Sequence, residues 1–132
     1  MRLSLSDYDQ VAMIVEPIID DIGDRCGKET LVQEIKSSCH NGKAFLFIAI
    51  DGFVVLKPLP DKGVLVWVAY CEGGNAFERY HESINELADV VSAQFLECWT
   101  VRKGMSRTLP KYGWSHHRNS EHYQIWRKYY AH

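Results

Sequence analysis

Gly73, Gly74, Asn75 and Ala76 stand where a run of apolar residues gives way to a helical pattern. A helix N-terminus offers backbone N–H groups without partners and a partial positive charge, and glycines let the backbone come close to an anion. Residues of this type in this order therefore predict a site where main-chain amides bind a phosphate. The simpler alternative is that the glycines only turn the chain from a strand into a helix.

Charged side chains that would complement a ligand are unevenly distributed. Residues 1–34 hold eight acidic and three basic side chains, whereas residues 99–132 hold seven basic and one acidic. This asymmetry is compatible with a cationic end for a phosphate-bearing ligand and an acidic end for an amine. Two ordinary solvated surfaces would give the same counts.

Other classes of site are not expected. The four cysteines form no CxxC pair and the six histidines form no HExxH motif, so we expect no bound metal and no disulfide framework. No apolar run approaches the roughly 20 residues of a membrane helix, and residues 1–10 lack the apolar segment of a signal peptide. With a net charge of −2 and no known motif, nucleic-acid binding is not expected. These features favour a cytoplasmic protein.

The elements that would position the glycine turn fit one domain, residues 1–132, with the 46% hydrophobic and 24% charged composition of a soluble globular protein. Pro17 should kink or split the first helix, Gly23 should end it, and Asp51-Gly52 should form a hairpin turn. Strand 64–70 should be central and parallel to strand 96–101, with a helix between them. Periodicity predicts strands over 2–5, 43–50, 53–57, 64–70, 96–101, 114–118 and 123–129, and helices over 6–22, 28–38, 77–95 and 103–109.

This order of elements resembles the fold of the Gcn5-related N-acetyltransferase (GNAT) superfamily over essentially the whole chain. In that family the turn after the fourth strand carries Q/R-x-x-G-x-G/A. Residues 71–76 read CEGGNA, so Gly74 and Ala76 match the small positions and Cys71 replaces the usual Gln or Arg. Residues 111–114, KYGW, are similar to the K-x-G-F/W that usually opens the sixth strand. The resemblance implies a single-domain α/β fold with a mixed, mostly antiparallel sheet, a central splayed parallel strand pair, and helices on both faces.

The resemblance also implies a cosubstrate, acetyl-coenzyme A. Its pantetheine arm would lie between strands 64–70 and 96–101, where a backbone N–H near Ala69 or Tyr70 would polarise the thioester carbonyl. Arg102 and Arg107 would reach the coenzyme phosphates. The pyrophosphate would lie on the turn, at Glu72, Gly73, Gly74, Asn75 and Ala76.

Catalytic groups depart from the family pattern. The family usually places a tyrosine, as general acid to the leaving thiolate, four residues before the glycine of its G-F pair. Here that position is Leu109, and Tyr112 is the nearby alternative. The general base should be a carboxylate or histidine near the strand ends. Glu97, beside the expected cleft, is our candidate, with Glu72 and His117 as the other choices.

The resemblance thus predicts transfer of an acetyl group from acetyl-coenzyme A to the amine of a small molecule or peptide, by direct attack and without a covalent enzyme intermediate. In the family, the loop between the first two helices borders the acceptor site. Asp20, Asp21 and Asp24, which we place in that loop, would suit a cationic amine such as a lysine side chain or a polyamine.

The alternative is a catalytically inactive protein that uses the same fold for binding or assembly. Acetyltransferase-like proteins of this size occur in tailed phages, some as virion components, and such a protein would be found in the host cytoplasm or the virion. The aromatic C-terminal segment, which includes Trp114, Trp126 and Tyr129, would then contact a partner or a second copy of the chain.

Overall fold

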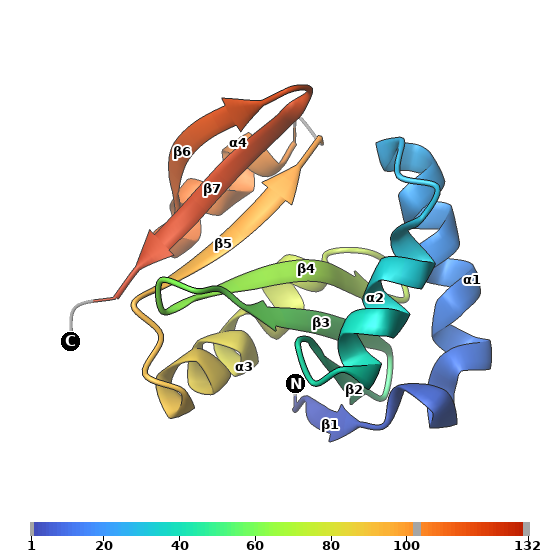
Figure 1. Cartoon of the computed structure of the whole chain (residues 1–132). Coiled ribbons are helices and arrows are strands. Elements are labelled where there is room, and N and C mark those ends of the chain that lie inside the picture. Colours follow the sequence, from blue (N-terminus) through green and yellow to red (C-terminus); the bar gives the residue numbers. More distant parts are fainter. Residues whose placement is uncertain (1, 102–103, 131–132) are drawn as a thin grey trace.

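The computed structural model describes residues 2–101 and 104–130 and shows one curved sheet with helices on both faces (Figure 1). Its strands are β1 (Ser4–Ser6), β2 (Phe45–Ala49), β3 (Gly52–Pro58), β4 (Gly63–Cys71), β5 (Phe95–Thr100), β6 (Ser115–Ser120) and β7 (Tyr123–Tyr129). Its helices are α1 (Tyr8–Cys26), α2 (Leu31–His40), α3 (Ala76–Val90), α4 (Met105–Thr108) and the 3₁₀ turn η1 (Leu109–Tyr112). This is the element order predicted from the sequence.

The sheet has the strand order β1-β2-β3-β4-β5-β7-β6. Every neighbouring pair is antiparallel except β4 and β5, which are parallel and are connected through α3. A parallel pair needs such a crossover, because a short turn cannot return the chain to the same edge of the sheet. The predicted mixed, mostly antiparallel sheet with a central parallel pair is confirmed.

β4 and β5 pair over a short length only. Their register ends at its third pair, Leu65 with Glu97. On the other side of β4 the register with β3 shifts between Val55 and Leu56, which leaves Trp67 as the extra residue of a β-bulge. A bulge bends its strand and increases the local twist, and this one falls two residues after the last β4–β5 pair. The two strands therefore diverge, as predicted, and the edge of β4 that faces β5 has no strand partner beyond Leu65 in the described part of the chain.

Each face of the sheet has its own hydrophobic core. On one face α1 and α2 bury Ile19 and Ile35 completely against residues of β2, β3 and β4. On the other face α3 and η1 bury Tyr80 and Leu109 completely. Figure 1 shows α2 in front of β3 and β4 and α3 behind them. The prediction of helices on both faces is confirmed.

The first helix differs from its prediction at its start and at Pro17. Asp7 is the N-cap, because its side chain accepts a hydrogen bond from the Asp9 amide at 3.3 Å, so the helix begins at Tyr8 and not at residue 6. The helix then continues through Pro17 without a break and reaches Cys26. Pro17 therefore does not split the helix.

The end of the first helix was also predicted wrongly. Gly27 ends α1 in the left-handed conformation, with a φ of 75°. Gly23 stays helical, and a Cβ atom there would lie 2.5 Å from the carbonyl oxygen of Lys28, so glycine is needed for a close approach. The later end also corrects the placement of three acidic residues, which lie near the end of α1 and not in a loop: Asp20, Asp21 and Asp24.

The remaining differences are shifts of element boundaries. α2 begins at Leu31 rather than at residue 28, and α3 ends at Val90, so that Phe95 belongs to β5. β6 extends to Ser120, and the turn before β7 includes Glu121 with a φ of 55°. In the described ranges, no helix has the length and apolar character needed to cross a membrane.

Candidate functional site

The turn between β4 and α3 has a backbone that requires glycine. Gly73 and Gly74 have φ values of 86° and 84°, and Asn75 follows in the left-handed region with a φ of 62°. The Gly74 amide donates to the Cys71 carbonyl oxygen at 3.1 Å and closes a β-turn. A Cβ atom at Gly73 or Gly74 would meet no atom within 4 Å. The space beside both glycines is therefore open, and it is their conformation, not crowding, that selects glycine.

Only some amides of this turn remain available to a ligand. The Glu72 amide donates to the Asp51 carbonyl oxygen at 2.8 Å, and the Gly74 amide is used within the turn. Among the described residues, the amides of Gly73 and Asn75 donate to no carbonyl, and Ala76 begins α3, where the first amides have no intrahelical partner. The predicted anion site is thus narrowed to the amides of Gly73, Asn75 and Ala76.

Cys71, which replaces the usual Gln or Arg, stabilises the turn from inside. Its side chain is buried, and its thiol donates to the Gly74 carbonyl oxygen at 2.8 Å. Burial raises the pKa of the Cys71 thiol above its usual value. The thiol therefore stays protonated and acts as a hydrogen-bond donor, which argues against a role as a nucleophile.

Three residues hold this turn against the β2–β3 hairpin through contacts that the sequence did not predict. The hydroxyl of the fully buried Tyr80 donates to Asp51 at 2.6 Å, and Arg79 forms an ion pair with the same carboxylate. The hydrogen bond from Tyr80 and the charge of Arg79 hold the pKa of the Asp51 carboxyl below its usual value, and burial raises the pKa of Tyr80. In the sequence Tyr80 is only one apolar position of a helix, so no local signal reveals this contact.

The predicted strand residues and basic residues are placed as follows. Ala69 and Tyr70 are half-buried near the end of β4, just before the turn. Both lie beyond Leu65, the last residue of β4 that pairs with β5. Glu72 is exposed beside the turn, and Arg107 is exposed on α4. Arg102 lies outside the described residues. The structure thus brings the strand and turn residues together and leaves the contribution of the arginines as a prediction.

Glu97, the candidate base, is buried and already paired. Its carboxylate accepts a hydrogen bond from the Arg127 guanidinium at 2.8 Å and from the Trp99 indole N–H at 2.9 Å. Its side chain is 8% exposed. Both carboxylate oxygens have donors, so the geometry favours a structural role for Glu97 over a free general base.

Tyr112, the candidate acid, packs in an aromatic cluster on the α3 side of the sheet. Its ring lies 5.7 Å from Phe77 and 4.7 Å from His81. Trp114 also packs on Phe77, at 5.4 Å, and its buried indole N–H has no hydrogen-bond partner among the described residues. Leu109, at the usual acid position, is completely buried. These contacts assign packing roles to Leu109 and Tyr112.

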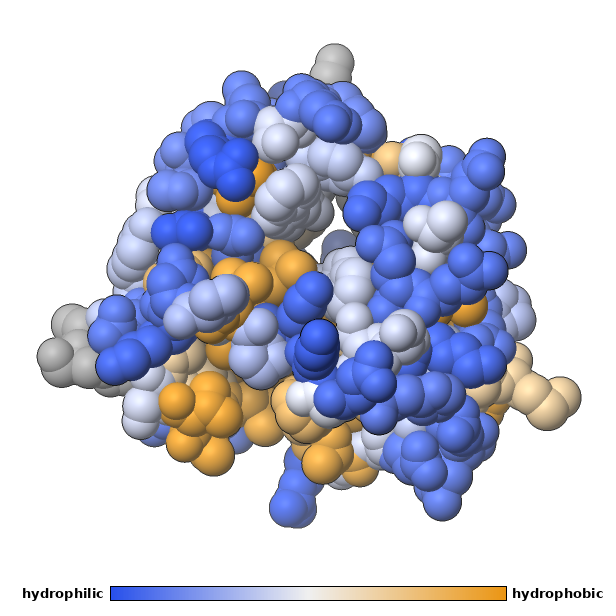
Figure 2. Space-filling view, viewed as in Figure 1, coloured by the Kyte–Doolittle hydropathy of each residue, from blue (hydrophilic) through white to orange (hydrophobic). Residues whose placement is uncertain are grey.

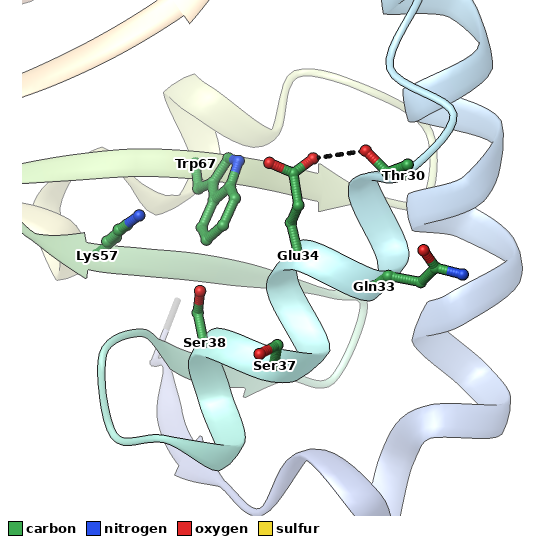
Figure 3. Close-up of a pocket in the computed structure, with 7 residues that line it drawn as sticks. All are labelled: Thr30, Gln33, Glu34, Ser37, Ser38, Lys57 and Trp67. Atoms are coloured by element: carbon green, nitrogen blue, oxygen red, sulfur yellow. Dashed lines mark hydrogen bonds between the residues drawn. The ribbon is translucent and has the colours of Figure 1, made fainter.

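A pocket of about 390 Å³ lies on the opposite face of the sheet, beside α2 (Figure 3). Glu34, Ser37 and Ser38 face Trp67 from α2, and the Lys57 ammonium lies 4.9 Å from the centre of the indole ring. The Thr30 hydroxyl donates to Glu34 at 3.0 Å. The pocket is lined by Thr30, Gln33, Glu34, Ser37, Ser38, Lys57 and Trp67. Because Trp67 is the bulge residue of β4, the pocket borders the place where β4 and β5 diverge.

The β6–β7 hairpin reaches across to the end of α1. The Tyr123 hydroxyl donates to the Cys26 carbonyl oxygen at 3.0 Å, and the His122 Nε2 atom lies 3.2 Å from the same oxygen. Figure 2, in the same view as Figure 1, shows the surface hollowed between the part formed by α1 and α2 and the part formed by β5, β6 and β7. The β6–β7 hairpin and the end of α1 are therefore in contact, and the surface between the two parts of the molecule is hollowed. Across the described residues, no group of three His, Cys, Asp or Glu side chains is placed to hold a metal ion.

The chain is similar to known proteins in its three-dimensional structure. No protein-family model matches the chain, and no curated protein sequence matches it. A protein of Desulfovibrio desulfuricans described as an acetyltransferase of the GNAT family superposes with a TM-score of 0.73, at 12% identity over 96% of this chain and 97% of that one. Tetrahymena GCN5 gives a TM-score of 0.70, at 9% identity over 98% of this chain and 96% of that one. This chain has the GNAT fold. The PaiA N-acetyltransferase of Thermoplasma acidophilum, solved in complex with coenzyme A, gives a TM-score of 0.59 at 17% identity, over 98% of this chain and 100% of that one.

The candidate site follows the chain from the edge of β4 that has no strand partner beyond Leu65 to the β4–α3 turn, where the amides of Gly73 and Asn75 donate to no carbonyl among the described residues. The sequence predicted the turn and the strand edge. It missed Trp67, because a bulge depends on the register of neighbouring strands. It also missed the contact between Asp51 and Tyr80, because the two residues are 29 positions apart.

Proposed function

We propose that this chain is an acyl-coenzyme A-dependent N-acyltransferase that transfers an acetyl group to an amine. The observation that carries the proposal is the unpaired edge of β4, which leads directly to main-chain amides at a helix N-terminus. An extended chain with amide groups can pair with a free strand edge, and a phosphate at its end can bind the helix N-terminus. Pantetheine pyrophosphate has this arrangement of groups.

The residues would divide the work along this path. The amides of Gly73, Asn75 and Ala76 would bind the pyrophosphate, and Arg107 would add a charge-assisted contact. Bound acetyl-coenzyme A supplies an acyl group that is activated as a thioester. An amide at Ala69 or Tyr70 would stabilise the negative charge that develops on the acyl oxygen when an amine attacks.

In the proposed site, proton transfer is supported by fewer residues than coenzyme binding. Glu97 and Tyr112 are the candidate base and acid, but the contacts of Glu97 with Arg127 and the packing of Tyr112 leave neither one free. An amine that has lost its extra proton to water enters the cleft in its neutral form and can attack without a base on the enzyme. As the C–N bond forms, the C–S bond of the thioester breaks, and the proton shed by the nitrogen passes to the departing coenzyme A thiolate, directly or through water. The proposal therefore places catalysis in orientation and in the main-chain amide, with modest help from side chains.

A catalytically inactive binding or assembly protein is the second candidate. The observation that favours it is Leu109, which is completely buried at the position where GNAT enzymes usually carry the acid tyrosine. Such a protein would keep the fold and would not release free coenzyme A. Turnover therefore separates the two candidates, whereas coenzyme binding alone does not.

The first test is thermal stability with acetyl-coenzyme A. A ligand that binds only the native state stabilises it by about 2.7 kcal/mol at 100 times its Kd, so occupancy must raise Tm. Gly74→Glu should abolish the shift, because it places an anionic side chain in the open space beside the turn. A free-thiol assay with candidate amines then measures turnover.

Gly42→Glu is the matched control for this experiment. Gly42 also has a positive φ, 70°, and also has open space beside it, but it lies after α2 and away from the turn. It carries the same backbone strain without the added charge at the site. No Tm shift of the wild type at millimolar acetyl-coenzyme A would reject coenzyme binding, and an equal loss in both variants would reject the turn as its site.

A further inference from the structure

The lining of the pocket between α2 and Trp67 combines one aromatic side chain with polar and charged side chains. One aromatic face is present, and every other lining side chain is polar or charged. The indole of Trp67 is half-buried, and Glu34, Ser37 and Ser38 surround it from α2 (Figure 3). This combination gives one apolar plane with hydrogen-bonding groups around its edge.

The Lys57 ammonium shows that the face of the Trp67 indole can contact a positively charged group. It lies 4.9 Å from the ring centroid, within the range of a cation–π contact. The negative face of an indole also attracts C–H groups that carry partial positive charge, as those on the flat face of a sugar ring do. Lys57 and the two serine hydroxyls can then hydrogen-bond to ring hydroxyls, and the Glu34 carboxylate can accept from an ammonium group.

We propose that this pocket is the acceptor subsite and that its ligand is an amino sugar, a monosaccharide with a primary amine. This inference rests on the proposed N-acyltransferase function and adds its substrate class. The sugar ring stacks on Trp67, its hydroxyls bind Ser37, Ser38 and Lys57, and its amine is held on the side of Glu34.

The size and charge of the pocket disfavour other amines. A volume of about 390 Å³ is near the lower end of the roughly 300–1,000 Å³ of small-molecule sites, which suits one ring. A polyamine would need several carboxylates, but Glu34 is the single acidic residue of the lining and lies 3.5 Å from the Lys28 ammonium. An alkyl amine would leave the serine hydroxyls without ligand partners.

The position of Trp67 on β4 connects the pocket to the reaction path. Trp67 is two residues before Ala69, which is roughly 7 Å along a strand. A ring stacked on the indole would therefore lie beside the strand segment that carries the main-chain amide we assign to the acyl oxygen. The bulge at Trp67 separates β4 from β5 at the same point, so the two ligands would meet where the strands diverge.

The test is a titration of the ¹⁵N-labelled full chain with D-glucosamine, followed by NMR through the indole N–H signals and the backbone amides. We expect saturable shifts at the Trp67 indole and at Ser37 and Ser38. Trp67→Leu should weaken binding by about tenfold, which corresponds to about 1.4 kcal/mol. Glu34→Gln should weaken glucosamine but not D-glucose, because only the amine uses the carboxylate.

Trp99→Leu is the matched control, because Trp99 is a 42% exposed indole of β5 that does not line the pocket. It should leave glucosamine binding unchanged. Shifts that spare Trp67, no saturation at tens of millimolar glucosamine, or tighter binding of spermidine or cyclohexylamine would each overturn the inference.

The Tm shift with acetyl-coenzyme A, measured on the same variants, keeps the two proposals apart. If acetyl-coenzyme A stabilises the chain but glucosamine does not bind at Trp67, the substrate class is wrong and the enzyme proposal stands. If glucosamine binds at Trp67 but acetyl-coenzyme A does not bind at all, the acceptor role is overturned together with the proposed function. Binding of both, with acetylated glucosamine as the product, supports both proposals.

Discussion

The ion pair between Glu97 and Arg127 decides whether Glu97 is a structural residue or a free base. The two side chains are 8% and 19% exposed, and their atoms approach to 2.8 Å. The guanidinium also lies 4.1 Å from the centre of the Phe95 ring. Arg127→Met keeps an unbranched side chain of similar length over that ring and removes only the charge and its hydrogen bonds. Glu97 is then left as a buried carboxylate with the Trp99 N–H as its remaining donor.

The expected cost follows from this burial. Breaking one partner of a buried ion pair typically costs 3–5 kcal/mol, because the other charge stays uncompensated. Since Arg127 keeps some contact with water, we expect the lower end, about 3 kcal/mol. For a chain of this length that corresponds to a fall in Tm of roughly 10 °C. The double variant Glu97→Leu/Arg127→Met should recover most of the loss, because a hydrophobic pair replaces the ion pair without leaving a charge.

Chemical denaturation of the four proteins in this double-mutant cycle measures the coupling directly. A cost below about 1 kcal/mol for Arg127→Met, the value of a solvated surface pair, would refute the reasoning. So would a double variant that is no more stable than Arg127→Met alone. Either result would mean that Glu97 is not bound by Arg127 in solution, and its carboxylate would return as the leading candidate for the general base.

Three further predictions follow from single contacts. Gly52→Ala should cost about 3 kcal/mol or more, because its Cβ would lie 1.9 Å from the Tyr70 carbonyl oxygen; a denaturation midpoint like that of the wild type would contradict the β3–β4 register. In thiol labelling of the native protein, Cys71 and Cys98 should react far more slowly than the other two cysteines, because both are buried and burial raises the pKa of Cys98 to about 12; four equally fast thiols would exclude this. Burial lowers the pKa of His81 below its ordinary 6.5, so the unfolded chain takes up the proton first and stability should fall as the pH drops below 6.5. His81→Gln should flatten that part of a plot of Tm against pH, and identical plots would argue against a buried neutral ring.

The alternation of strands and helices could be predicted from the sequence because each element carries its own periodicity. The strand Tyr123–Tyr129 was predicted with its observed bounds, and the helix after the glycine turn was placed within one residue of its observed start. Both patterns depend on residues that are neighbours in the chain. The splay between β4 and β5 was also predicted, but only through the resemblance to the GNAT fold.

The reason why glycine is required at positions 23 and 52 could not be predicted from the sequence. Asp51-Gly52 was predicted as the two-residue turn of a hairpin, but Gly52 pairs with Ala49 inside the strands, and the turn lies one residue earlier. Glycine is required at position 52 because Tyr70 and Tyr80 approach it closely from β4 and α3. Gly23 was predicted to end a helix, but it lies within α1 and is likewise required by a close contact with Lys28. A glycine that permits a positive φ and one that permits a close contact look alike in a sequence, because the second depends on elements far along the chain.

Cys71 departs from the GNAT pattern and Glu72 adds a negative charge to the turn, and the structure gives the two residues different consequences. Cys71 replaces a long polar side chain with a short donor that bonds Gly74 within the turn, so the turn keeps its shape without reaching toward a ligand. Glu72 adds a carboxylate, but its amide is bound to Asp51 and its side chain is exposed, so it can point into solvent. The turn itself therefore offers a phosphate main-chain dipoles and no side-chain cation, so that the charge-assisted contact we propose must come from Arg107 on α4. Since main-chain dipoles carry no net charge, the affinity for phosphate should depend less on salt than that of a site built on several arginines.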